Sequence, residues 1–216
     1  VFDELCANFF TLSDNRKRIR KEKKAKKFSK IKSNLIIKKL PFNLTNSQQN
    51  VLEEINEDLS GKKRMFRIVQ GDVGSGKTIV SLLAIANIIE SGYQCALMGP
   101  TEILSKQHYQ LAIKIFKDFN FRIDFLSGKT EAKNRTIILK GLETGETNLL
   151  IGTHALFQDG VNFKDLALII IDEQHRFGVN QRVALREKGS HSKKQPHQLI
   201  MTATPIPRTL AMAAYA

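Results

Sequence analysis

The stretch MFRIVQGDVGSGKT, residues 65–78, decides the fold that this sequence predicts. Residues 65–69 are a short apolar run rich in β-formers, and helical periodicity begins at Thr78 and continues to residue 91. The loop between them matches the pattern GxxxxGK[ST]. Its glycines allow a tight turn in which backbone N–H groups point inward, and the following helix adds the positive end of its dipole. The bare pattern arises by chance in roughly 1% of chains of this length. A chance match that also lies between a strand and a helix is rarer still, so the sequence predicts a phosphate-binding loop here.

Two side chains of this loop are expected to act directly on a nucleotide. Lys77 brings a positive charge to the β- and γ-phosphate oxygens of ATP, and the Thr78 hydroxyl is a ligand for Mg²⁺. The residues predicted to bind ATP in the loop are Gly71, Asp72, Val73, Gly74, Ser75, Gly76, Lys77 and Thr78.

Apolar β-rich runs alternate with helical stretches along the rest of the chain. Strands are expected at residues 65–69, 95–98, 122–126, 149–151, 166–171 and 198–201. Helices are expected between them, at 78–91, 102–119 and 131–142. Because the strand runs are apolar throughout, the sheet should be parallel and covered on both faces. The predicted fold class is α/β, a three-layer P-loop domain with a central parallel sheet whose ligands bind at the carboxyl edge.

The run IIIDEQH, residues 169–175, places carboxylates directly after one of these strands. Asp172 is expected beside Mg²⁺, and Glu173 is expected to orient or deprotonate the attacking water. An Asp-Glu pair after a strand is by itself more often the start of a helix. Its position about a hundred residues after a phosphate loop favours catalysis. Gln174 and His175 extend the same edge, where they can sense the γ-phosphate or couple it to DNA contacts.

Charge is concentrated in one segment. Residues 16–39 hold thirteen Lys or Arg against one acid, Glu22, whereas the rest of the chain has 21 basic and 20 acidic residues. The net charge of +13 therefore describes a basic arm on a neutral body. The arm is open to two interpretations, a solvated helix or linker, and a DNA-facing helix that neutralises phosphates. Before it, Leu5, Phe9 and Leu12 predict an amphipathic helix.

Neither a membrane nor an oxidising compartment is indicated. No apolar run reaches the ~18–20 residues that a membrane helix needs, and the first residues carry acid where a signal peptide carries base. Cys6 and Cys95 lie far apart without metal-binding spacing, which is typical of core side chains in a reducing compartment. A cytoplasmic location is expected.

Three motifs in this order carry a family resemblance. GDVGSGKT, DEQH and TAT are similar to motifs I, II and III of superfamily 2 helicases. Longer segments resemble the RecG family of branch-migration helicases: LPFNLTNSQQ, ALMGPTEILSKQH, IGTHALFQ, IIIDEQHRFGVNQR and MTATPIPRTLA. The resemblance covers residues 41–216 and implies a RecA-like domain of an ATP-dependent DNA helicase. Such a helicase acts on branched DNA, at forks and Holliday junctions, in recombination and repair. Translocases of the transcription-repair coupling type share GDVG and RFGV and remain an alternative.

The resemblance also implies roles for residues outside the loop. Those expected to read the adenine are Phe42, Thr45 and Gln48. Those expected to line the path of a DNA strand are Pro100, Thr101, Glu102, Ser127, Gly128, Lys129, Gly152, Thr153 and His154. Those expected to couple nucleotide state to DNA are Arg176, Gln181, Arg182, Thr202, Ala203 and Thr204.

The resemblance further predicts which part of a motor this chain represents. Residues 41–216 match the first RecA-like lobe, residues 1–40 match the trailing end of a missing N-terminal wedge domain, and a second RecA-like lobe is absent. An arginine finger is worth about 10³–10⁵ in rate in other phosphoryl-transfer systems. Weak binding of Mg·ATP and little hydrolysis are therefore expected of the chain alone. A non-motor module that binds ATP and DNA is the alternative.

Overall fold

The computed structural model describes residues 33–61, 64–173 and 196–203. Its elements in chain order are α2 (Ser33–Ile37), α3 (Asn46–Ser60), β1 (Phe66–Gln70), α4 (Lys77–Glu90), β2 (Gln94–Met98), α5 (Glu102–Phe116), β3 (Ile123–Leu126), α6 (Ala132–Thr144), β4 (Leu149–Gly152), the 3₁₀ turn η1 (His154–Phe157), β5 (Leu166–Asp172) and β6 (His197–Thr202). Each predicted strand is present, and its ends lie within one residue of the predicted ends.

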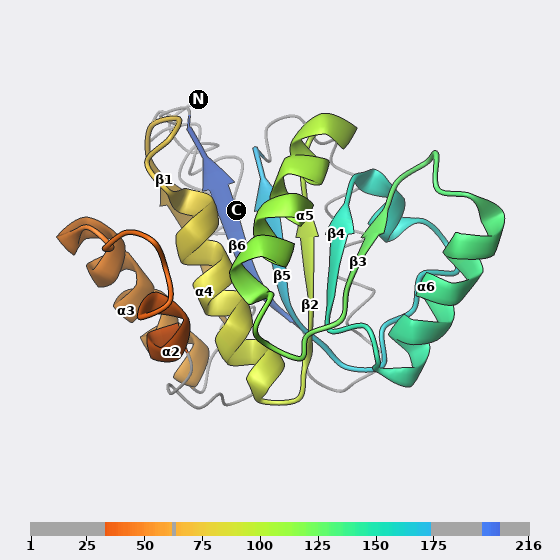
Figure 1. Ribbon diagram of the computed structural model, residues 1–216, viewed down its shortest axis with the longest axis horizontal. Helices are drawn as coiled ribbons and strands as arrows, with labels where there is room; N and C mark the ends of the chain where they lie inside the picture. Colours follow the sequence, from red (N-terminus) through yellow and green to blue (C-terminus); the bar gives the residue numbers. More distant parts are fainter. Residues whose placement is uncertain (1–32, 62–63, 174–195, 204–216) are drawn as a thin grey trace, which may run out of the picture.

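The strands form one sheet in the order β1-β6-β5-β2-β4-β3, and every neighbouring pair is parallel. In Figure 1 the strand arrows all point toward the top of the view, which is the carboxyl edge. The last residues of β1 and β6, Gln70 and Thr202, are register partners, and Asp172 of β5 is aligned with Met201 of β6. The segments that follow these strands therefore begin side by side.

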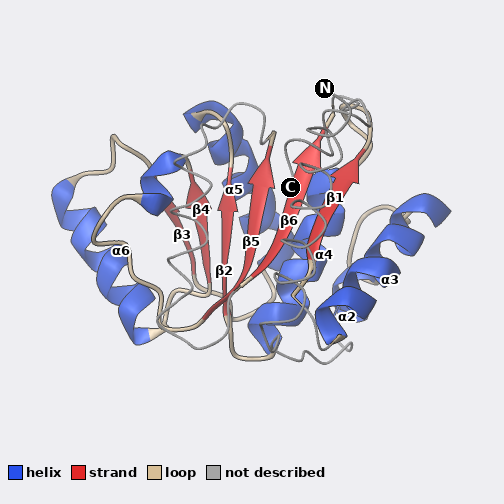
Figure 2. Ribbon diagram, turned by 180° about the vertical axis from the view of Figure 1, so that it is seen from behind, coloured by secondary structure: helices blue, strands red, loops and turns tan. Residues whose placement is uncertain are grey.

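Side chains of the central strands alternate between two cores, one on each face of the sheet. In β5, Leu168 and Ile170 belong to the core under α4 and α5, whereas Ile169 and Ile171 belong to the core that includes residues of α6 and η1. Figure 2 views the sheet from behind, with α4 and α5 beyond it and α6 at one end. This arrangement explains why the strand runs are apolar at every position. The prediction of an α/β, three-layer P-loop domain with a central parallel sheet is confirmed.

One helix is shorter than predicted. Helical periodicity extends from residue 102 to 119, but α5 ends at Phe116. The N–H of Phe119 bonds to the carbonyl of Phe116 at 2.9 Å, and the rings of Phe119 and Phe121 stack with centroids 5.7 Å apart. The aromatic side chains thus close a turn in which Phe119 and Phe121, both partly buried, pack against the core. Cys95 is buried in the core, as predicted.

The end of the basic arm packs against the domain. Ile36 of α2 is 1% exposed within the core that also contains α4, and the N–H of Ser33 donates to Asn87 Oδ1 at 2.8 Å. Lys39 makes an ion pair with Asp118 at 3.1 Å. Residues 1–32, which include the predicted amphipathic helix and most of the arm, lie outside the described residues. Within the described part of the chain, no helix is both long and apolar enough to cross a membrane.

Candidate functional site

The phosphate-loop sequence joins β1 to α4 at the carboxyl edge of the sheet. The N–H of Gly71 donates to Thr202 O at 3.2 Å, which ties the start of the loop to the end of β6. The N–H of Ser75 donates to Asp72 O at 3.1 Å and closes a turn. Gly74 and Gly76 adopt φ angles of +84° and +85°, a left-handed conformation that disfavours other residues. The glycine spacing of the motif therefore has a direct conformational cause.

Lys77 reaches back across the loop. Its Nζ donates to Gly71 O at 2.6 Å and to Asp72 O at 2.8 Å. The helix α4 begins at Lys77, and its N-cap residue, Gly76, supplies no side-chain hydrogen bond to the first turn. Backbone N–H groups at an uncapped helix start are suited to bind an anion, as is the adjacent ammonium group. These donors fit a phosphate group.

Gln48 connects the start of α3 to the same loop. Its Oε1 accepts from the N–H of Thr45 at 3.0 Å, which completes a capping box, and its Nε2 donates to Ser75 O at 2.9 Å. A methyl group on Gly76 would collide with Gln48 Nε2. The structure therefore brings Gln48 and Thr45 to the phosphate loop. Phe42, on the segment before α3, is 47% exposed.

The carboxylates of the second motif stand at the end of β5. Glu173 has a φ of +52°, a strained conformation for a residue with a side chain. Its N–H donates to Met201 O at 2.8 Å. Its Oε1 accepts from the N–H of Ala203 at 2.8 Å, and its Oε2 accepts from Thr202 Oγ1 at 3.2 Å. The segments after β5 and β6 are thus joined through the Glu173 carboxylate.

Asp172 contacts a histidine that motif analysis did not assign. Oδ2 of Asp172 lies 2.8 Å from Nε2 of His108, which projects from the middle of α5. His108 belongs to a segment that resembles the RecG family, but its position in a helix gives no signal that its partner lies 64 residues away. Gln174, His175, Arg176, Gln181, Arg182 and Thr204 lie outside the described residues.

The oxygen donors of this region fit the coordination preferences of Mg²⁺. Thr78 in the first turn of α4 offers a hydroxyl, and Asp172 offers a carboxylate. Among the described residues, no group of three or more His, Cys, Asp or Glu side chains forms a metal cluster. Mg²⁺ is commonly held by one or two carboxylates together with substrate phosphates rather than by a full protein cage. Thr78 and Asp172 suit that mode of binding.

The ends of β2, β4 and β3 form the other half of the carboxyl edge. The carbonyl of Gly152 accepts from the N–H of Gly99 at 2.9 Å and from Ser105 Oγ at 3.0 Å. The N–H of Thr153 donates to Leu126 O at 3.3 Å. These bonds bring together the segments predicted to line the path of a strand: Pro100 to Glu102, Ser127 to Lys129, and Gly152 to His154. His154, Gly128 and Lys129 are exposed, whereas Ser127 and Thr153 are buried.

Two lysines converge on Glu102 in this half. Thr101 caps α5 through Oγ1, which accepts from the N–H of Leu104 at 3.3 Å. Glu102 pairs with Lys106 at 2.8 Å and with Lys129 at 3.6 Å. The hydrogen bond from Lys106, with a smaller effect from Lys129, lowers the pKa of Glu102 below its usual range. Glu102 thus holds both lysines beside the predicted strand path.

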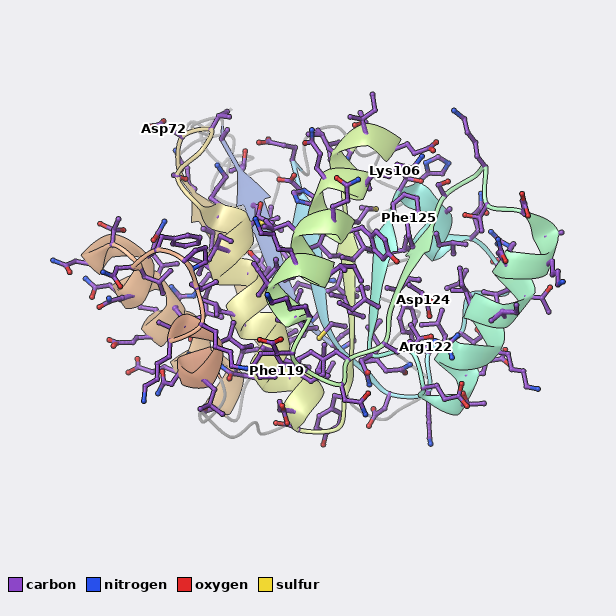
Figure 3. All side chains as sticks on the ribbon, viewed as in Figure 1. Asp72, Lys106, Phe119, Arg122, Asp124 and Phe125 are labelled. Carbon is purple, nitrogen blue, oxygen red and sulfur yellow. The ribbon has the colours of Figure 1, made fainter. Side chains whose placement is uncertain are left out.

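An open groove of about 570 Å³ lies beside these lysines. Its walls come from α5, β3, the following loop and α6, and include Lys106, Tyr109, Phe125, Lys129, Asn134 and Ile137. Figure 3 shows Lys106 and Phe125 on the right of the molecule, while Asp72 of the phosphate loop lies at the upper left. The groove therefore belongs to the β3 side of the sheet and is separate from the phosphate loop.

Comparison with known proteins gives consistent matches. The family model described as DEAD/DEAH box helicase matches residues 45–213. The chain is 55% identical over 177 residues to the ATP-dependent DNA helicase RecG of Haemophilus influenzae, covering 82% of this chain and 26% of that protein. It is 46% identical to RecG of Aquifex aeolicus over 100% of this chain and 27% of that protein.

Among solved structures, a structure of RecG bound to a three-way DNA junction matches with a TM-score of 0.78 and 43% identity. The match covers 95% of this chain and 27% of that chain. The chain thus spans about a quarter of the length of the curated relatives it matches. The resemblance to RecG that the motifs predict is confirmed.

Proposed function

The chain belongs to the DEAD/DEAH box helicase family, and on that premise we propose that it is the ATP- and DNA-binding half of a RecG-type DNA helicase motor. The observation that carries the proposal is the junction of three segments at one edge of the sheet. The phosphate loop after β1, the carboxylates after β5 and the residues after β6 are hydrogen-bonded to one another through Gly71, Glu173 and Thr202.

In this proposal, the half of the edge at β1, β6 and β5 binds ATP and positions the attacking water. Backbone N–H groups of the loop and the Lys77 ammonium bind the β- and γ-phosphates of ATP. Gln48, already bonded to Ser75 O, lies where it can also contact the base. Glu173 orients the attacking water, and its bonds to Thr202 and Ala203 transmit its position to the segment after β6. Its strained backbone supports a functional role over a packing role.

Mg²⁺, when bound through Thr78 and Asp172, neutralises charge that develops on the phosphate oxygens. The remaining contribution of the chain is geometric. Lys77 and the start of α4 fix the phosphates, and the Asp172 side chain is held by His108 at 2.8 Å.

The substrate class follows from the second half of the edge. Its exposed groups are backbone, a helix N-terminus and the lysines beside Glu102, which suit contacts to the sugar–phosphate backbone and carry no base-specific pattern. We assign branched DNA, at forks and Holliday junctions, as the substrate because most of this chain's length matches RecG. The same match supports a cytoplasmic role in recombination and repair.

Full activity requires further parts in this proposal. We place residues 41–216 in the first RecA-like lobe and residues 1–40 at the end of a wedge domain. A second RecA-like lobe supplies an arginine to the transition state, a contribution of about 10³–10⁵ in rate where it has been measured. Binding of ATP and DNA then resides in this chain, and fast hydrolysis depends on the second lobe.

The substitution Lys77→Ala tests the proposal. A charge-assisted hydrogen bond contributes about 1.5–3 kcal/mol, so ATP affinity should fall about 10- to 100-fold. Calorimetric titration with a slowly hydrolysed ATP analogue measures it, and forked DNA binding should be unchanged. Lys140→Ala, an exposed lysine of α6, is the control. Unchanged ATP affinity in a folded Lys77→Ala variant would contradict the assignment.

A further inference from the structure

His108 connects the two halves of the carboxyl edge. It projects from α5, the helix that starts at the predicted DNA-contact segment, toward Asp172 at the end of β5. The contact is 2.8 Å long, and the two side chains are only 11% and 14% exposed. A contact this short between two nearly buried side chains fixes both of them.

The proton on this contact can be assigned from chemistry. A carboxylate oxygen only accepts hydrogen bonds, so Nε2 of His108 carries the hydrogen and donates it to Oδ2 of Asp172. Oδ1 of Asp172 makes no hydrogen bond within the described part of the chain. The imidazole therefore holds one oxygen of the carboxylate and leaves the other as an acceptor.

The imidazole is mounted on a fixed support. One turn earlier, Ser105 Oγ lies within hydrogen-bond distance of two carbonyl oxygens, Gly152 O at 3.0 Å and Thr101 O at 2.8 Å. One turn later, Ala112 is fully buried in the core, and Phe116 is 2% exposed. The middle of α5 cannot shift without breaking these contacts, so the direction of the His108 N–H is set by the fold.

We propose that His108 is a positioning residue for Asp172, which selects the carboxylate orientation that binds a divalent cation. The proposal rests on the proposed function, in which Asp172 and Thr78 hold Mg²⁺. Mg²⁺ demands near-ideal geometry from each ligand, and groups that hydrogen-bond to a ligating carboxylate typically alter metal affinity 10- to 100-fold. Without the His108 N–H, the Asp172 side chain can rotate, and the cation loses a pre-oriented ligand.

The test measures how ATP-analogue affinity depends on Mg²⁺. The variants are His108→Leu, which has no donor, His108→Asn, whose shorter amide cannot reach, and His108→Gln, whose amide nitrogen approximates Nε2. We expect Leu and Asn to raise the Mg²⁺ concentration for half-maximal affinity about 10-fold, and Gln to restore it. Affinity in excess EDTA should be unchanged in all three. Gln107→Leu, exposed on the same helix, is the matched control.

Binding of Mn²⁺, followed by electron paramagnetic resonance in the presence of the analogue, gives a second readout of the same ligand. It should weaken in the Leu and Asn variants and recover in the Gln variant. If His108→Leu melts below the working temperature, the comparison of Asn with Gln carries the test.

Two results would overturn the inference. A wild-type Mg²⁺ requirement in folded His108→Leu or His108→Asn shows that Asp172 needs no support. An equal loss of affinity with and without Mg²⁺ shows that His108 only stabilises the fold. Failure of the proposed function itself has a different signature, since wild type and Lys77→Ala would then bind the analogue alike in EDTA.

Discussion

The two halves of the carboxyl edge are built from different groups. At β1, β6 and β5, long charged or amide side chains tie the segments together: Lys77 donates to two loop carbonyls, Gln48 to a third, and Glu173 accepts from the chain after β6. At β2, β4 and β3, backbone groups and a serine hydroxyl join the strand ends, with Gly152 O as a shared acceptor. The charged side chains of this half, Glu102 with Lys106 and Lys129, pair beyond the strand ends, between α5 and the loop after β3.

In the proposed function, the half at β1, β6 and β5 binds ATP (the nucleotide half) and the half at β2, β4 and β3 binds DNA (the DNA half). The difference between them then corresponds to the difference between a fixed ligand and a moving one. A triphosphate binds in one place, and concentrated charges held by many bonds suit it. A strand that must slide needs contacts that repeat along its backbone, and small residues leave the surface open for it. The His108–Asp172 contact lies at the boundary, where β2 pairs with β5.

The largest effect is expected from Gly152→Ala, because a methyl group at this position would overlap the carbonyl oxygen of Leu126 and crowd Leu156. Backbone of the paired strand β3 cannot move aside as a side-chain tip can, so the cost should reach about 3 kcal/mol, the upper end for overpacking. Thermal unfolding should show a melting temperature about 10 °C lower.

Two other glycines make this prediction specific. At Gly128, in the same half, a methyl group meets nothing within 4 Å, so Gly128→Ala should leave the melting temperature nearly unchanged. At Gly71, in the nucleotide half, the nearest atom is the hydroxyl of Ser75 at 2.8 Å, which can rotate. If Gly152→Ala has the same melting temperature as either of these variants, the backbone at the β4–β3 edge is not rigidly packed.

The sequence was sufficient for features that depend on neighbouring residues. The apolar runs predict each strand, and the glycines of the loop predict its tight turn, in which Gly74 and Gly76 adopt left-handed φ angles. Contacts between segments far apart in the sequence cannot be predicted in this way. The partner of His108 is 64 residues away, and the pairing of Glu102 with Lys129 depends on how α5 meets the loop after β3. Glu102 matches a DNA-contact motif. Its i,i+4 spacing indicates the ion pair with Lys106, but no local pattern shows the pair with Lys129.

Gln48 offers a medium-sized test of the nucleotide half. Its side chain bridges Thr45 and Ser75 and is predicted to read the adenine. Loss of one hydrogen bond is worth about 1 kcal/mol, so Gln48→Ala should lower ATP affinity about fivefold and remove the preference for ATP over GTP. Competition titrations with both nucleotides measure this. Gln49→Ala is the control, because Gln49 bonds to Leu44 O and does not contact the loop. Equal losses of affinity for ATP and GTP would show that Gln48 only supports the loop and does not read the base.

The smallest effect should come from Lys129 in the DNA half. Its side chain is 84% exposed, and its ion pair with Glu102 is long at 3.6 Å, so the substitution Lys129→Ala should not change stability. A single phosphate contact contributes about one unit to the slope of log affinity against log salt. Lys129→Ala should therefore reduce that slope by about 1 and weaken DNA binding to a similar degree for unrelated sequences, as measured by fluorescence anisotropy of a labelled fork over a salt series.

The controls for Lys129 separate a phosphate contact from general charge. Lys140→Ala removes the same charge from α6 and should leave the slope unchanged. Glu102→Gln should strengthen binding, because it removes a carboxylate that competes with phosphate for Lys106 and Lys129. If Lys129→Ala and Lys140→Ala shift the slope equally, the DNA half is a diffuse positive surface rather than a defined strand path. If Glu102→Gln weakens binding, the carboxylate is needed to hold the two lysines in place, and the ion pairs contribute more than their exposure suggests.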